Sequence, residues 1–145
     1  SIYNLSYIII NNIYIFVVMS NLVKVFNDHL IEFLDDVITI FPENTDIQTG
    51  RTFIIGIKKV NPKKIIKSWK MYINDKYIDE IDKSNMDFFI NKDYTQDLQY
   101  TTGNINNIIN NIKILLRETS QENKDKSLKY VQNLCKICNL YYANK

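Results

Sequence analysis

The sequence predicts an all-α fold, a single compact bundle of five to seven helices with short connections. Apolar residues recur at spacings of three and four along most of the chain, which is typical of helices that bury one face. Only three of the 145 residues are Gly and two are Pro, too few for the many tight turns of an all-β fold. A chain of 145 residues is long enough for one domain with a core and short for two.

Residues 1–18 differ from the rest of the chain. No charged residue occurs between Ser1 and Val23, and residues 13–19 are continuously apolar. This run is shorter than the about 20 apolar residues that cross a bilayer, and it lacks the basic start and cleavage site of a signal peptide. We expect Met19 to be the natural start, with 1–18 as translated upstream sequence and 19–145 as a single helical domain. A marginal hydrophobic anchor over residues 1–19 and a buried N-terminal element remain alternatives.

The first helix is expected from about Asn21 to Ile40, capped by Ser20 or Asn21 and ended by Pro42. Half of its surface is charged, so the other half should face the core. That apolar half is a stripe formed by Leu22, Phe26, Leu30, Phe33, Val37 and Phe41.

A second helix is expected from about Asp46 to Val60. The motif Thr45-Asp46-Ile47-Gln48 predicts a capping box, with Thr45 as N-cap and Gln48 reaching back to it. Gly50 and Gly56 would weaken this helix and therefore suggest a close approach of another helix. A short strand over 52–57 is the alternative. The side chains expected to be buried are Ile47, Phe53, Ile54 and Ile57.

Asn61 and Pro62 predict a new helix start, because Pro is well tolerated at the first helical position. This third helix should run from Pro62 to about Ile73 and end in a turn at Asn74-Asp75. Short helical segments over 76–83 and 85–90 should follow, and then a loop over 95–103 with Gly103 as its hinge. The apolar arc of the third helix is Ile65, Ile66, Trp69, Tyr72 and Ile73.

Two longer helices complete the expected fold, from about Asn104 to Glu118 and from about Gln121 to Tyr142. The first should bury Ile105, Ile108, Ile109, Ile112, Leu115 and Leu116. The second places apolar residues at alternating spacings of three and four, which is typical of a packing seam. This seam contains Leu128, Val131, Cys135, Cys138 and Tyr142.

Residue types that carry catalysis or bind metals are scarce. His29 is the single histidine, which removes most zinc sites and most His-based acid–base chemistry. Cys135 and Cys138 form a C-x-x-C pair inside a predicted helix, where we expect buried thiols; a metal shared between molecules and redox chemistry are the alternatives. No glycine-rich phosphate loop is present in the sequence. We predict no enzymatic activity, no catalytic residue, no bound metal and no cofactor.

A block of positive charge lies between Arg51 and Lys70, which includes seven cations and no acidic residue, while the flanking segments are acidic. It could pair with carboxylates of its own fold, bind nucleic acid without sequence preference, or bind an acidic protein. The pI of about 8.4 and the presence of only two Arg argue against a dedicated nucleic-acid-binding domain. The candidate binding residues are Lys58, Lys59, Lys63, Lys64, Lys67 and Lys70.

Several short motifs together resemble a family of small uncharacterised proteins of nucleocytoplasmic large DNA viruses, the giant viruses, over about residues 22–98. The motifs are Phe26…Ile31-Glu32-Phe33-Leu34-Asp35-Asp36, Phe41-Pro42-Glu43, Lys59-Val60-Asn61-Pro62-Lys63, Trp69…Tyr72, Tyr77…Glu80-Ile81 and Asp87-Phe88-Phe89-Ile90-Asn91-Lys92-Asp93-Tyr94. The resemblance implies a viral origin and a helical domain, and it carries over no activity and no catalytic residue.

We therefore expect a non-enzymatic helical viral protein that acts by surface interaction, as a virion component or as an accessory protein of infection in the host cytoplasm. A protein partner is expected, and the absence of a disulfide framework indicates a reducing compartment. A sequence-indifferent nucleic-acid-binding protein that uses the Lys58–Lys70 face is one alternative. A membrane-anchored viral protein that uses residues 1–19 is the other. The sequence leaves the oligomeric state open.

Overall fold

The computed structural model of the protein describes residues 21–97 and 105–144, and all regular structure in these ranges is helical. The elements are α2 (Leu22–Ile40), α3 (Thr45–Val60), α4 (Lys63–Trp69), the π-helix η1 (Lys70–Asn74), α5 (Asp75–Asp82), α6 (Met86–Asn91), α7 (Ile105–Glu118) and α8 (Gln121–Ala143). Since α4, η1 and α5 follow one another without a break, the described chain forms six helical rods. The predicted all-α bundle is confirmed.

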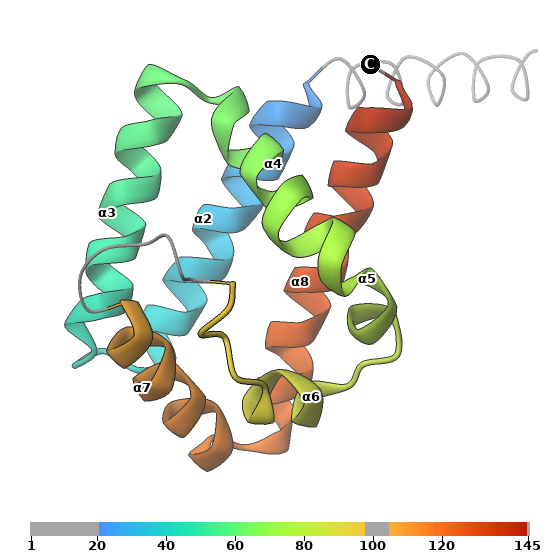
Figure 1. The fold of residues 1–145 in the computed structure, drawn as a ribbon. Coiled ribbons are helices and arrows are strands. Elements are labelled where there is room, and N and C mark those ends of the chain that lie inside the picture. The colour runs from blue at the N-terminus through green and yellow to red at the C-terminus, as the bar shows by residue number, and fades with distance from the viewer. Residues whose placement is uncertain (1–20, 98–104, 145) are drawn as a thin grey trace, which may run out of the picture.

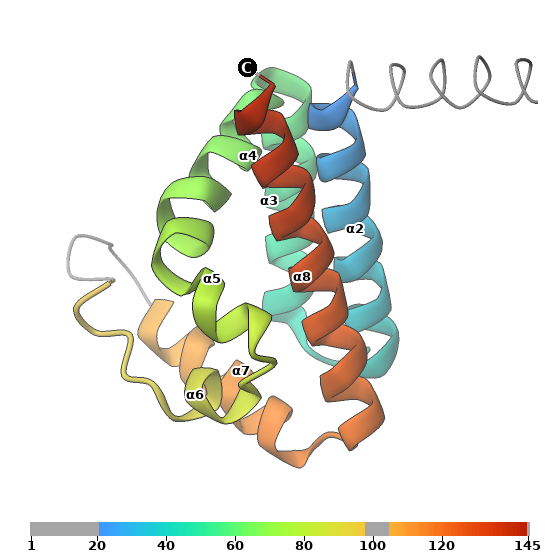
Figure 2. The same ribbon diagram turned by 90° about the vertical axis from the view of Figure 1, so that its right-hand side faces the viewer.

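Helix α2 is the central element of the bundle. It packs along α8 and α3, while α4, η1 and α5 cover one face of the α2–α8 pair, in front in Figure 1 and to the left in Figure 2. Helices α6 and α7 lie together at the lower end of the molecule in both views. The core is therefore built mainly between α2, α4 and α8.

The centre of this core is Phe26, which is fully buried and meets Trp69 edge-to-face with ring centroids 5.6 Å apart. Around it lie Leu30, Ile65, Ile66, Leu134 and Cys138, all of them buried. Asn27 is also buried, and its Nδ2 donates a hydrogen bond to the Pro62 carbonyl at 3.1 Å. This bond holds the start of α4 against α2.

Helix α2 confirms the predicted first helix within one residue. Its stripe is buried over its first half, at Leu22, Phe26 and Leu30, and half-buried beyond Phe33. Helix α3 confirms the second helix, so the alternative of a short strand over 52–57 is wrong.

Two predicted details of α3 are also wrong. The helix begins at Thr45, one residue earlier than predicted, so the N-cap is Asn44 and not Thr45. The Oδ1 of Asn44 accepts the Ile47 N–H at 3.1 Å. Gln48 instead donates to the Pro42 carbonyl. A Cβ at Gly50 or Gly56 would meet no atom of the described residues within 4 Å, so none of the described helices approaches either glycine closely.

The chain does not turn at Asn74-Asp75 as predicted. The helix continues through the π-helix η1 and then as α5 to Asp82. Asn74 is buried, and its Nδ2 donates to Asn139 Oδ1 of α8 at 2.9 Å. A partner 65 residues away in the sequence therefore binds the Nδ2 of a side chain that would otherwise favour a turn.

The remaining elements follow the predictions closely. Helix α4 begins at Lys63, one residue late, and α5 and α6 match the two short segments. Helices α7 and α8 confirm the last two helices, with Leu128, Cys135 and Cys138 buried on the seam of α8. The side chain of Ile105, residues 1–20 and the part of the expected loop over 98–103 that includes Gly103 lie outside the described residues.

Candidate functional site: a groove with lysines on its rim

The positive block does not form one continuous face. Arg51 binds Asp35, and Lys58 Nζ lies 2.8 Å from Asp28 Oδ1. Hydrogen bonds from Lys24 and then Lys58 lower the pKa of Asp28. Lys70 binds Asp75, and its Nζ lies 5.2 Å from the centroid of the Tyr142 ring. Three of the seven cations therefore form ion pairs with carboxylates of the same chain.

The other four lysines, Lys59, Lys63, Lys64 and Lys67, are exposed and form no ion pair with any carboxylate in the described part of the chain. Lys59 belongs to α3 and, at 3.6 residues per turn, projects about 160° away from Ile57. Lys63, Lys64 and Lys67 share one arc of about 100° on α4. These last three lysines are called the lysine rim below.

Lys64 lines a groove of about 520 Å³ between α3 and the α4–η1 helix, which we call the α3–α4 groove. Leu30, Ile54, Ile57, Ile65 and Trp69 contribute apolar side chains to it. Its lining is mostly apolar, and the polar groups among its described lining residues include the Lys64 amine and the hydroxyls of Ser68 and Tyr72.

Two aromatic residues that line this groove are open to solvent. Phe53 is 67% exposed and Tyr72 is 57% exposed, although the periodicity of their helices predicted that both would be buried. Both line the groove between α3 and η1, two elements that diverge in Figure 1. The sequence showed an apolar face on each of the two helices, but it did not show that a groove would separate these faces.

The groove and its lysine rim can bind a ligand that is apolar on one side and anionic on the other. An apolar face would displace water from Phe53 and Tyr72, and carboxylates beside it would lie near Lys63, Lys64 and Lys67. The groove lining contains no His, Cys, Asp or Glu among the described residues. The arrangement is therefore suited to binding.

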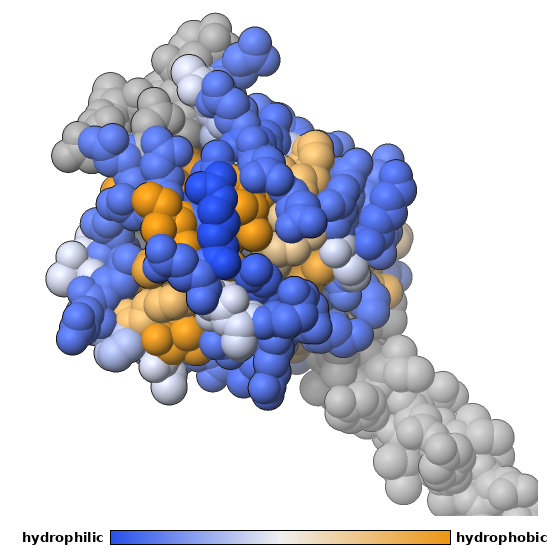
Figure 3. Space-filling view, turned by 90° about the horizontal axis from the view of Figure 1, so that it is seen from below, coloured by the Kyte–Doolittle hydropathy of each residue, from blue (hydrophilic) through white to orange (hydrophobic). Residues whose placement is uncertain are grey.

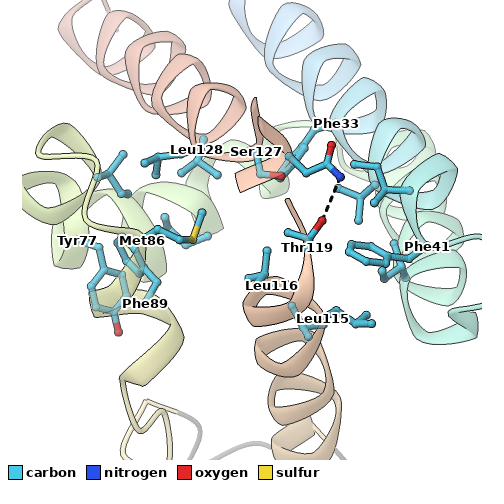
Figure 4. Close-up of a pocket in the computed structure, with 18 of the residues that line it drawn as sticks. Phe33, Phe41, Tyr77, Met86, Phe89, Leu115, Leu116, Thr119, Ser127 and Leu128 are labelled. Atoms are coloured by element: carbon cyan, nitrogen blue, oxygen red, sulfur yellow. Dashed lines mark hydrogen bonds between the residues drawn. The ribbon is translucent and has the colours of Figure 1, made fainter. Parts of the chain in front are cut away.

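A second hollow lies beneath α7, with a volume of about 450 Å³, and we call it the α7 cavity. Its walls come from every described helix and include Phe41, Tyr77, Phe89, Leu116 and Leu128, with Thr119, Asn123 and Ser127 adding a few polar atoms (Figure 4). The cavity is partly open to solvent, so it is a recess in the surface rather than a sealed void.

The predicted thiols are confirmed as buried and free. Burial raises the pKa of Cys135, and it raises the pKa of Cys138 to about 11, so neither thiol supplies a thiolate near neutral pH. His29 is half-buried with Nδ1 3.4 Å from Glu32, and its ring lies 5.0 Å from that of Tyr130. In the described ranges, no three His, Cys, Asp or Glu side chains converge as a metal site would require.

The same ranges contain no helix that is both long and apolar enough to cross a membrane. Comparisons with known proteins add no assignment, since no family model, no curated protein and no solved structure matches this chain.

Proposed function

We propose that the protein acts by binding an acidic amphipathic helix of a partner protein in the α3–α4 groove. The observation that carries the proposal is the position of the lysine rim, which has no carboxylate partner in the described structure, beside an apolar groove with exposed aromatic side chains. Amphipathic helices commonly bind in such grooves through apolar anchors spaced three and four residues apart.

The exposed aromatic side chains are the reason for preferring a protein to nucleic acid. Phe53 and Tyr72 offer large apolar areas, and such residues contribute strongly to protein interfaces. Binding to a phosphate backbone would need further cations, but Lys58 and Lys70 already pair with Asp28 and Asp75. Fewer lysines of the Lys58–Lys70 set are therefore available for a phosphate backbone than the sequence suggested, which weakens the nucleic-acid alternative.

The test uses two helical peptides, one with leucines on one face and glutamates on the other, and a second in which lysines replace the glutamates. We expect fluorescence anisotropy to show that the full chain binds the acidic peptide, and more weakly at high salt. Phe53→Ser should weaken this binding by about tenfold, because truncating an interface anchor costs about 1–2 kcal/mol. Leu140→Ser, at a position 46% exposed on α8, is the matched control and should change nothing.

Substitution of the lysine rim separates the two alternatives. K63E, K64E and K67E together should abolish binding of the acidic peptide, and short DNA and RNA duplexes should bind the wild-type chain weakly or not at all. If instead the duplexes bind tightly, the peptide does not, and Phe53→Ser leaves duplex affinity unchanged, the nucleic-acid alternative replaces this proposal. Equal affinity for the acidic and the basic peptide would also contradict it.

The biological setting of this proposal comes from the family resemblance. A surface-binding protein of a giant virus, in the virion or in the host cytoplasm, would use such a groove to recruit a viral or host protein. Membrane attachment through residues 1–19 stays a prediction, because these residues lie outside the described structure.

A further inference from the structure

The α7 cavity is elongated and lined mainly by aromatic and aliphatic side chains. Phe41 lies at one end in Figure 4, while Tyr77, Met86 and Phe89 lie at the other, with Leu116 between them. Its volume of about 450 Å³ falls within the range of small-molecule sites, about 300–1,000 Å³. Asn123 Nδ2 donates to Thr119 Oγ1 at 3.0 Å, and the rest of the wall is almost entirely apolar. An unbranched hydrocarbon chain fits such a space.

The cavity is partly open to solvent, and part of its wall comes from α6 and α7, which form the lower end of the molecule in Figure 1. Figure 3 views this end and shows hydrophobic side chains exposed between hydrophilic ones. Hydrophobic patches and apolar hollows at the surface often mark ligand sites.

Two cations flank the apolar face of α7 on the side of α6. Lys113 Nζ lies 5.7 Å from the ring centroid of Tyr94, which lines the cavity, and donates to the Lys92 carbonyl at 2.5 Å. Arg117 Nη2 donates to the Ile90 carbonyl at 3.1 Å. Lys113 and Arg117 are one turn apart, and each follows a residue that lines the cavity, Ile112 and Leu116 respectively.

Neither cation forms an ion pair within the described residues. The carboxylates on this side of the molecule have other donors, since Asp93 accepts from the hydroxyl and the backbone N–H of Thr95. Asp97 accepts from the Tyr77 hydroxyl and from Lys76. Lys113 also contributes, after the hydrogen bonds from Thr95, to the lowered pKa of Asp93. An anion beside Lys113 and Arg117 would therefore give a direct ionic partner to two cations that now donate to backbone carbonyls.

From the apolar cavity and the two cations beside it, we propose that the protein binds a single-chain amphiphile with an anionic head, such as a long-chain fatty acid. The acyl chain occupies the α7 cavity and the head group binds Lys113 and Arg117. This site is separate from the α3–α4 groove, although Trp69 and Ile73 contribute to the walls of both.

The test is displacement of a fluorescent fatty acid from the full chain after removal of lipids. We expect saturable binding of one probe per chain, displaced by hexadecanoic acid better than by hexadecanol. K113E with R117E should weaken binding of the acid at least about tenfold, because it removes two charge-assisted contacts, and should leave binding of the alcohol within about twofold. K63E with K67E is the matched control and should bind both compounds as the wild type does.

A second pair of substitutions tests the chain-binding part of the site. I112F with L116F should fill the cavity and reduce binding of both the acid and the alcohol, with helicity checked by circular dichroism. Absence of saturable binding to the wild type would overturn the proposal. An unchanged preference for the acid over the alcohol in the variant with K113E and R117E would also overturn it. This second outcome does not depend on whether the variant with I112F and L116F folds.

Discussion

At the scale of single residues, the buried side chains are strongly constrained by burial and by partners on other helices. Cys138 is fully buried, and its Sγ lies 4.0 Å from the Ile66 carbonyl of α4. Because the thiolate would have to form in an apolar environment, burial raises the pKa of Cys138 to about 11. The C-x-x-C pair therefore stabilises the core and does not resemble a reactive redox pair.

This burial predicts how stability depends on alkaline pH. The unfolded thiol ionises at about 8.5, whereas the folded thiol of Cys138 ionises at about 11. Between these values the unfolded state releases the proton and the folded state keeps it, so rising pH should destabilise the protein by up to about 3 kcal/mol. Urea unfolding of the wild type and of Cys138→Ala from pH 7 to 11 measures the effect.

The control is the difference between the two pH profiles, because lysines and tyrosines also titrate in this range. Cys138→Ala should be less stable at pH 7 and lose less stability on the way to pH 11. Parallel profiles would contradict the assignment of the effect to Cys138. Native Cys135 and Cys138 should also react with a thiol reagent only after unfolding.

At the scale of single elements, the ends of the helices depend on side chains that cap them. Ser120 caps α8, Asn85 caps α6 and Asn44 caps α3. Each side chain accepts a hydrogen bond from the backbone N–H of the residue three positions later in the chain. Two of these three caps are Asn, a residue that is so frequent in this chain that its abundance alone predicts no cap.

The corrected cap of α3 predicts the outcome of two alanine substitutions. Asn44→Ala should lower the free energy of unfolding by about 1 kcal/mol, because the Ile47 N–H loses its acceptor. Thr45→Ala should change it by less than about 0.5 kcal/mol, as is usual for an exposed site. Urea unfolding measures both, and Asn44→Asp should restore the cap. A larger cost for Thr45→Ala than for Asn44→Ala would support the capping box instead.

At the scale of the whole molecule, the packing is uneven. The contact of α2 with α8 is the most extensive one between described elements, whereas α7 packs mainly against α6 and otherwise faces the α7 cavity. Local stability follows the number of buried apolar contacts. The lower end of the molecule should therefore open more readily than the upper end.

Hydrogen exchange should show this difference directly. The amides of α7 are expected to exchange fastest among the long helices, and those of α2 and α8 slowest. Addition of a long-chain fatty acid should slow exchange in α7 and leave α3 unchanged. Protection of α7 equal to that of α8 in the lipid-free protein would show that the α7 cavity is closed by packing in solution.

The sequence by itself determined the positions and the type of the helices. Helical periodicity is a local property, so Leu22, Phe26 and Leu30 identify the buried face of α2 without knowledge of its neighbours. The burial of Cys135 and Cys138 followed from the same pattern. The continuation through Asn74 could not be predicted, because its partner Asn139 is distant in sequence.

Only the tertiary structure decided which charged groups lack an ion-pair partner and which apolar groups remain exposed to solvent. Lys58 pairs with Asp28 and Lys70 with Asp75, whereas Lys63, Lys64 and Lys67 have no carboxylate partner among the described residues. Phe53 and Ile57 follow the same apolar pattern on α3, yet Phe53 is 67% exposed. Periodicity indicates which face of a helix turns inward, but the spacing between two helices depends on distant side chains, and that spacing created both the groove and the cavity.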